Sequence, residues 1–197
     1  MSPCFETMFY ENGSVRNMEY HQKRFDLTRY RLFKTAEKID LENIISCCQI
    51  ENMSRVKVIY HKEVVKIECS PLTDRDFKTF RLTESNIKYS YKYMDRKELE
   101  SIKKRNTDVD DVIIYNSEGL LKDTTIANIA LYIEGNWVTP KRPLLHGTVR
   151  EKLLKEKFLT AKDLMIEDIN IATNFAIMNA LIGFKEIEGD LQCCIKH

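Results

Sequence analysis

Residues 111–134 read DVIIYNSEGLLKDTTIANIALYIE and contain two apolar runs separated by polar and glycine residues. Residues 111–115 and 126–134 are rich in β-branched and aromatic side chains, which predicts one strand in each run. The intervening residues 116–119, Asn-Ser-Glu-Gly, predict a turn. Asp123 stands just before the second strand, where a carboxylate either faces a cationic ring nitrogen or is an ordinary turn aspartate.

Beyond this strand pair, a glycine stands directly before a predicted helix. Residues 137–140 predict a short strand, and residues 148–158 predict a helix that begins after Gly147. The N–H groups and the dipole of a helix N-terminus favour an anion. Gly147 therefore marks either an anion site or a loop whose geometry needs glycine. The tail predicts a short helix near Asp168 and a strand over residues 175–180.

On the N-terminal side of the strand pair, Lys92 lies among aromatic residues in the segment YSYKYMDR, residues 89–96. Residues 86–93 predict an extended segment, and residues 96–106 predict a charged helix. Burial lowers the pKa of a lysine and makes its amine nucleophilic, as Schiff-base chemistry requires. The alternative is a lysine that buries its stem and keeps its ammonium group in water, and Lys88 is then an equal candidate.

The first part of the chain predicts a lobe of its own. Residues 4–10 predict a strand, and residues 20–38 predict a helix with apolar positions spaced i, i+3 and i+4. His21-Gln22-Lys23-Arg24 on that helix is either a solvated charged face or part of a site. Further elements are a short helix capped by Asp40, a hairpin over residues 55–60 and 64–69, and a strand over residues 77–82.

These elements predict an α+β chain in two lobes, with strands before and after helices in each lobe. We place the boundary after residue 85. Residues 1–85 then form an N-terminal α+β lobe, and residues 86–197 form a C-terminal α/β lobe that carries Lys92.

Composition excludes several classes of protein. The chain has 197 residues, 43% of them hydrophobic, with 6 Gly and 4 Pro, which excludes a disordered or fibrous chain. Its 31 basic and 30 acidic residues leave a net charge of +1, which argues against a nucleic-acid partner. No apolar run approaches the roughly 18–20 residues that cross a bilayer. The six cysteines have no CxxC spacing, and the opening residues lack the pattern of a secretory signal, so we expect a cytoplasmic chain with no metal.

Five blocks follow one another along the chain. They are Phe5-Glu6-Thr7 with His21-x-x-Arg24-Phe25; Lys92-Tyr93-Met94-Asp95-Arg96; residues 110–128; Val138-Thr139-Pro140 with Leu145-His146-Gly147-Thr148-Val149-Arg150; and Met178-Asn179-Ala180-Leu181. Their order and spacing resemble the class IV, D-amino-acid-aminotransferase-like family of pyridoxal-phosphate (PLP) enzymes over residues 4–187. The resemblance implies a two-lobed α+β fold with the cofactor between the lobes, and a homodimer.

The resemblance implies a role for each matched residue. Lys92 would form the Schiff base with PLP and move protons at the substrate carbon. Asp123 would lie against the pyridine nitrogen and keep it protonated, which preserves the ring as an electron sink. Asn128 and Asn179 would lie near the cofactor or the substrate. Asp123 stands where the family usually has glutamate, so its carboxylate must approach more closely or act through water.

The resemblance also implies a phosphate site. Arg24 would hold the phosphate together with Gly147 and the backbone N–H groups of Thr148 and Val149. Many members have Gly-Ile-Thr at this loop, so the hydroxyl group has moved by one position in this chain. The family's usual leading segment of about twenty residues does not precede the first matched strand, and we expect a more open pocket or one completed by a dimer partner.

Three functions stay open for a small-molecule amino substrate. The first is a lyase that converts 4-amino-4-deoxychorismate to 4-aminobenzoate and pyruvate for folate synthesis, because residues 178–181 resemble the lyase branch. The second is an aminotransferase for branched-chain or D-amino acids, which needs a carboxylate pocket to which no arginine can be assigned from the sequence. The third is a cofactor-binding homologue without activity, because family membership alone does not fix activity.

Overall fold

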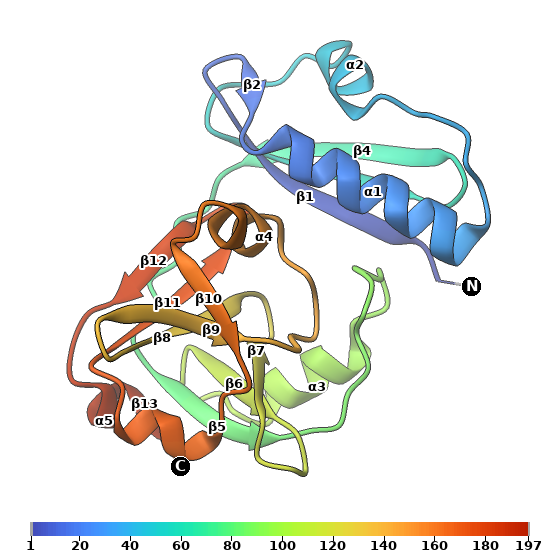
Figure 1. Cartoon of the computed structure of the whole chain (residues 1–197). Helices are drawn as coiled ribbons and strands as arrows, with labels where there is room; N and C mark the ends of the chain where they lie inside the picture. Colours follow the sequence, from blue (N-terminus) through green and yellow to red (C-terminus); the bar gives the residue numbers. More distant parts are fainter. Residues whose placement is uncertain (1, 197) are drawn as a thin grey trace. The chain divides into compact units, whose positions relative to one another are not determined.

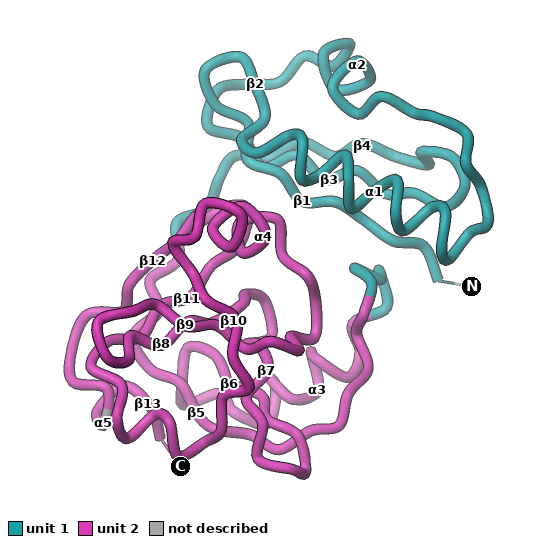
Figure 2. The backbone as a smooth tube through the Cα atoms, in the orientation of Figure 1, with its two compact units in different colours: residues 1–74, 91–95 teal, residues 75–90, 96–197 magenta. Residues whose placement is uncertain are grey.

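The computed structural model describes residues 2–196, and the chain divides into two compact units (Figure 2). Unit 1 holds the residues up to Asp74 together with Tyr91–Asp95, and unit 2 holds Arg75–Ser90 and the residues from Arg96 onward. The sequence interpretation placed the boundary after residue 85 and Lys92 in the second lobe. The structure instead divides the chain after Asp74, because the strand that follows pairs within unit 2. It also places Tyr91–Asp95, the segment that contains Lys92, in unit 1.

Unit 1 is a four-stranded antiparallel sheet with two helices (Figure 1). The strand order is β2-β1-β3-β4. The elements are β1 (Cys4–Glu11), β2 (Ser14–Val15), α1 (Met18–Phe33), α2 (Leu41–Ser46), β3 (Ser54–Tyr60) and β4 (Val64–Pro71). The predicted strand, capped short helix and hairpin are therefore confirmed, and the Asp40 side chain accepts a hydrogen bond from the Asn43 N–H group.

The core of unit 1 lies between α1 and one face of the β1–β3 pair. Cys4 and Met8 of β1, Phe25 of α1 and Tyr60 of β3 are fully buried in one apolar cluster. The Phe25 and Tyr60 rings meet edge to face with their centroids 4.5 Å apart. Burial of these large side chains supplies the main driving force for folding this unit.

Helix α1 ends earlier than the pattern predicted. The sequence indicated a helix as far as residue 38, but the helix ends at Phe33 because Lys34 adopts a left-handed conformation with φ of 58°. The Lys34 N–H group bonds to the Arg29 carbonyl, an end geometry that stops a helix.

Unit 2 is built on a mixed sheet of nine strands. Its main path has the order β10-β9-β8-β7-β6-β5-β13, and β11 pairs with β8 and β12 beside this path. The strands are β5 (Phe80–Glu84), β6 (Asp111–Tyr115), β7 (Leu121–Thr124), β8 (Asn128–Ile133), β9 (Asn136–Pro140), β10 (Leu159–Lys162), β11 (Asn174–Asn179), β12 (Gly183–Ile187) and β13 (Ile195–Lys196). The helices are α3 (Lys97–Lys104), α4 (Thr148–Lys155), the 3₁₀ helix η1 (Ile166–Asn170) and α5 (Leu191–Cys194).

The core of unit 2 gathers apolar residues from most of these strands. Ile113, Ile129 and Phe175 are almost completely buried in one cluster, and the Phe80 and Phe175 rings meet edge to face at 5.1 Å. The mixture of helices with parallel and antiparallel strands confirms the α+β class. Strand β7 was not predicted, because its residues were interpreted as a segment that leads into the strand expected over residues 126–134. Strands β10, β12 and β13 were not predicted either.

Candidate active site

Lys92 is held beside β1 by backbone hydrogen bonds. The Phe5 N–H group donates to the Lys92 carbonyl at 2.9 Å, and the Met94 N–H group donates to the Pro3 carbonyl at 2.8 Å. The expected extended segment over residues 86–93 forms no regular strand, and an isolated bridge between Cys4 and Tyr93 joins it to β1. The Lys92 ammonium nitrogen lies 4.8 Å from the centroid of the Phe5 ring, a distance typical of a cation–π contact.

A buried carboxylate on the same strand binds two side chains of α1. Glu6 is fully buried, and its two oxygens accept bonds from Arg24 Nε at 2.9 Å and Arg24 Nη2 at 2.5 Å. His21 Nδ1 lies 2.7 Å from Glu6 Oε2. His21 and Arg24 are three residues apart, so they lie on one face of the helix. The two bonds to Glu6 fix the plane of the Arg24 guanidinium group.

The charges in this cluster follow from burial and pairing. Burial raises the pKa of the Glu6 carboxyl, but the Arg24 charge and the hydrogen bonds from His21 and Arg24 outweigh it and lower that pKa to about 2. Burial lowers the pKa of His21, against the opposing effect of Glu6. At neutral pH, His21 is therefore neutral and donates its Nδ1 proton to an ionised Glu6.

In unit 2, Asp123 and Asn128 face each other across β7 and β8. Asp123 Oδ1 accepts a bond from Asn128 Nδ2 at 2.8 Å, and Asp123 Oδ2 accepts one from the Leu145 N–H group at 2.9 Å. Asn128 Nδ2 also donates to the Leu145 carbonyl at 2.8 Å. Burial raises the pKa of Asp123 to about 6, although these hydrogen bonds act in the opposite direction. A nearby cation would strongly stabilise the charged form of such a buried carboxylate.

The start of α4 lies against the same pair. Gly147 occupies the N-cap position, and no side chain caps the helix. A Cβ atom at Gly147 would lie 2.0 Å from Asn128 Oδ1, so only glycine fits beside this amide. Thr148 and Val149, which begin the helix, are buried. An uncapped helix N-terminus is an anion-binding element, because its first N–H groups have no acceptor within the helix.

Asn179 ends β11 and contacts the loop that follows β7. Its Nδ2 atom donates to the Ile126 carbonyl at 3.3 Å. Its Oδ1 atom accepts bonds from the N–H groups of Leu181 and Ile182 at 2.9 and 3.1 Å. Asn179 therefore supports the β7–β8 loop and shapes the turn after β11.

The predicted site residues thus form two groups, each within its own unit. Lys92 and Arg24 both lie by β1 in unit 1. The unit 2 group consists of Asp123, Asn128, Gly147, Thr148, Val149 and Asn179.

Sequence reasoning missed two residues in these groups. Glu6 was quoted as part of a matched block, but no role was assigned to it. The available signal was an acidic residue on a predicted strand together with His21 and Arg24 on one helix face. Leu145 acts through its backbone, and the sequence carries no signal for that contact.

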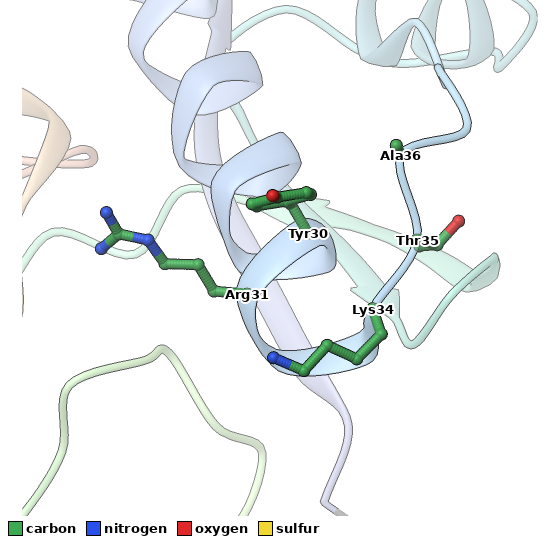
Figure 3. Close-up of a pocket in the computed structure, with 5 residues that line it drawn as sticks. All are labelled: Tyr30, Arg31, Lys34, Thr35 and Ala36. Carbon is green, nitrogen blue, oxygen red and sulfur yellow. The ribbon is translucent and has the colours of Figure 1, made fainter.

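A pocket of about 340 Å³ lies at the end of α1, and none of the predicted site residues lines it (Figure 3). Tyr30, Arg31, Lys34, Thr35 and Ala36 line it. Among residues 2–196, no three His, Cys, Asp or Glu side chains gather as a metal site. Within the same range, no helix has both the length and the apolar character to span a membrane.

The fold is that of fold-type IV PLP enzymes. A solved structure from Haemophilus somnus 129pt, provisionally named a 4-amino-4-deoxychorismate lyase, has a TM-score of 0.84 and 30% identity, covering 93% of this chain and 98% of that one. The PLP-bound form of a hypothetical aminotransferase from Mycobacterium tuberculosis has a TM-score of 0.76, covering 100% of this chain and 84% of that one. At 14% identity, the second likeness shows the fold alone.

The chain belongs to the amino-transferase class IV family, whose model matches residues 78–188. A relative from Haemophilus influenzae, whose name states no function, is 31% identical over 190 residues, covering 93% of this chain and 100% of its own length. The family is PLP-dependent.

The residues present fit this cofactor. Asp123 is a buried carboxylate whose charged form a cation would stabilise. Gly147 lets the Asn128 amide lie directly against the start of α4, a helix N-terminus that no side chain caps. When bound, PLP withdraws electrons from the substrate carbon, which lowers the cost of removing a proton there.

Proposed function

We propose that this chain is a PLP-dependent lyase that converts 4-amino-4-deoxychorismate to 4-aminobenzoate and pyruvate. The observation that carries the proposal is the likeness to the Haemophilus somnus protein, which extends over nearly the whole of both chains at 30% identity. The segment Met178-Asn179-Ala180-Leu181, which resembles the lyase branch, supports it from the sequence.

The proposed reaction needs no second substrate. A proton leaves the amine-bearing ring carbon, and the carbon–oxygen bond to the enolpyruvyl group breaks. The ring becomes aromatic, and the released enolate takes up a proton at its methylene carbon to give pyruvate. Atoms and electrons balance without an oxidant or a keto acid, whereas a transaminase must bind a keto acid to complete its cycle.

We assign each step to groups of this chain. Lys92 would hold the cofactor covalently and would remove the proton from the amine-bearing carbon of the substrate. Asp123 would lie against the pyridine nitrogen, where its carboxylate would favour the protonated ring. Arg24, which Glu6 orients, and the N-terminus of α4 would hold the phosphate.

The test measures pyruvate release from 4-amino-4-deoxychorismate with PLP and no keto acid, by coupling to lactate dehydrogenase and NADH. The proposal predicts sustained release. Lys92→Ala should abolish both the release and the covalent cofactor linkage, because the proposal assigns both to the Lys92 amine. Lys88→Ala is the matched control and should retain both, since Lys88 lies exposed in unit 2. Borohydride reduction followed by peptide mass spectrometry identifies the linked lysine, and a label on Lys88 would contradict the assignment.

Two outcomes would replace the lyase proposal. Conversion of PLP to pyridoxamine phosphate by leucine, glutamate or D-alanine, without pyruvate from 4-amino-4-deoxychorismate, would make the protein an aminotransferase. Covalent PLP binding with neither reaction would make it an inactive homologue. The homodimer implied by the family resemblance stays a prediction, which sedimentation equilibrium measures directly.

A further inference from the structure

The loop between β7 and β8 joins the two polar residues that the proposed function uses in unit 2. Asp123 and Asn128 form the single residue pair that β7 and β8 share, so the ladder between these strands is one pair long. A ladder this short does not by itself fix the positions of Asp123 and Asn128, which therefore depend on the contacts that hold residues 124–127, the last residue of β7 and the loop.

Bonds inside the loop close it into a turn. Thr124 Oγ1 accepts bonds from the N–H groups of Ile126 and Ala127 at 3.2 and 3.0 Å. This pattern, in which a threonine hydroxyl group binds the backbone two and three residues ahead, is a common way to build a tight turn.

Bonds from outside the loop hold it in place. Arg96 Nη2 donates to the Thr125 carbonyl at 2.7 Å, and Asn179 Nδ2 donates to the Ile126 carbonyl at 3.3 Å. Thr125 Oγ1 donates to Asp111 Oδ1 at 2.6 Å, which is a short, charge-assisted bond.

Asp111 is an unusual residue for the start of a core strand. It begins β6, is 2% exposed, and receives a second bond at Oδ1 from the Val112 N–H group at 2.9 Å. Its Oδ2 atom has no hydrogen-bond partner among the described residues. Burial accordingly raises the pKa of Asp111, against the effect of the Thr125 and Val112 bonds. Burying a carboxylate costs free energy, so an apolar side chain would be more stable at this position if packing were its only role.

We propose that Asp111 is a positioning residue for the cofactor-binding group of unit 2. Its carboxylate holds the Thr125 hydroxyl group and so fixes the loop that sets Asp123 opposite Asn128. The ligand that this arrangement serves is a cationic aromatic ring nitrogen against Asp123. The inference rests on the proposed use of PLP, and it extends that proposal to a residue that would not touch the cofactor.

The test compares PLP affinity across paired variants of the full-length protein, measured by equilibrium dialysis. Thr125→Val keeps the shape of the side chain but removes the donor to Asp111, and it should raise the Kd for PLP at least tenfold. Thr125→Ser restores the hydroxyl group and should stay within twofold of the unsubstituted protein. Asp111→Asn should weaken binding in the same direction as Thr125→Val. Asp110→Asn is the matched control and should stay within twofold, since Asp110 bonds instead to Lys78 and Thr79.

A double-variant cycle separates positioning from a merely structural role. If Asp111 acts through Asp123, then Thr125→Val should change the Kd by less than twofold when Asp123→Asn is already present. Equal tenfold losses in both backgrounds would overturn the proposal, and so would an unchanged Kd for Thr125→Val. If the unsubstituted protein fails to bind PLP, the proposed function and this inference both fall. If PLP binds but pyruvate is not released, only the lyase assignment falls.

Discussion

Replacement of Glu6 by glutamine tests the buried cluster that orients Arg24. The substitution keeps the shape of the side chain and removes its charge. Glu6 has a pKa of about 2 in the folded protein, against an ordinary value of 4.5 for a glutamate in water. At about 1.4 kcal/mol per pKa unit, this difference corresponds to about 3 kcal/mol of stability.

The sign of the pH dependence follows from the lowered pKa. Because the folded protein binds the Glu6 proton less readily than the unfolded chain, the stabilisation is fully present above pH 4.5 and is lost as the pH falls towards 2. Glu6→Gln should therefore lower the free energy of unfolding by about 3 kcal/mol at pH 7 and by about half as much at pH 3. The loss arises because the partly exposed Arg24 and the buried His21 would then lie beside a neutral amide.

Urea unfolding followed by far-UV circular dichroism measures this difference. Glu11→Gln is the matched control, because Glu11 lies on the same strand and pairs with Arg16, but both side chains are partly exposed. The control should lose less than about 1 kcal/mol. Equal losses for the two variants, or a loss for Glu6→Gln that does not change between pH 7 and pH 3, would show that the Glu6 charge does not stabilise the cluster.

Two further predictions concern unit 2. Burial raises the pKa of Asp123 from 3.8 to about 6, so folding penalises its charged form by about 3 kcal/mol above pH 6 and not below pH 3.8. Asp123→Asn removes this penalty but loses one acceptor for the Asn128 and Leu145 N–H groups, so its effect on the free energy of unfolding of the cofactor-free protein should be more favourable at pH 8 than at pH 4 by about 2 kcal/mol. Thermal unfolding at both pH values checks this, and an equal shift at each would contradict the assigned pKa. Gly147→Ala should destabilise the protein by about 1–3 kcal/mol, because the new Cβ would meet the Asn128 amide at 2.0 Å. Adding Gly147→Ala to Asn128→Ala should cost less in urea unfolding than adding it to the unsubstituted protein, and an undiminished cost would show that the amide is not the obstacle.

Local patterns determined much of the secondary structure. Strands β1, β3 and β4 and helix α2 were predictable because alternation, β-branched residues and a capping aspartate act over a few residues. Strands β10 and β13 were not, because each is short and pairs in parallel with a strand distant in the sequence. The predicted boundary after residue 85 lies beyond the division in the structure, which follows Asp74. Strand β5 belongs to unit 2 because it pairs in parallel with β6, a contact that the sequence around β5 does not reveal.

Residue type and spacing along the chain were enough to predict the α+β class and the family resemblance, and they supplied Lys92, Arg24 and Asp123 as predicted site residues. The groups that hold Arg24 and Asp123 became visible only in the folded chain. Glu6 reaches Arg24 across 18 positions, and the Leu145 N–H group reaches Asp123 across 22. These hydrogen bonds, together with burial, shift the pKa values of Glu6 and Asp123. Burial and hydrogen bonding depend on neighbours in space, so they have no local signature in the sequence.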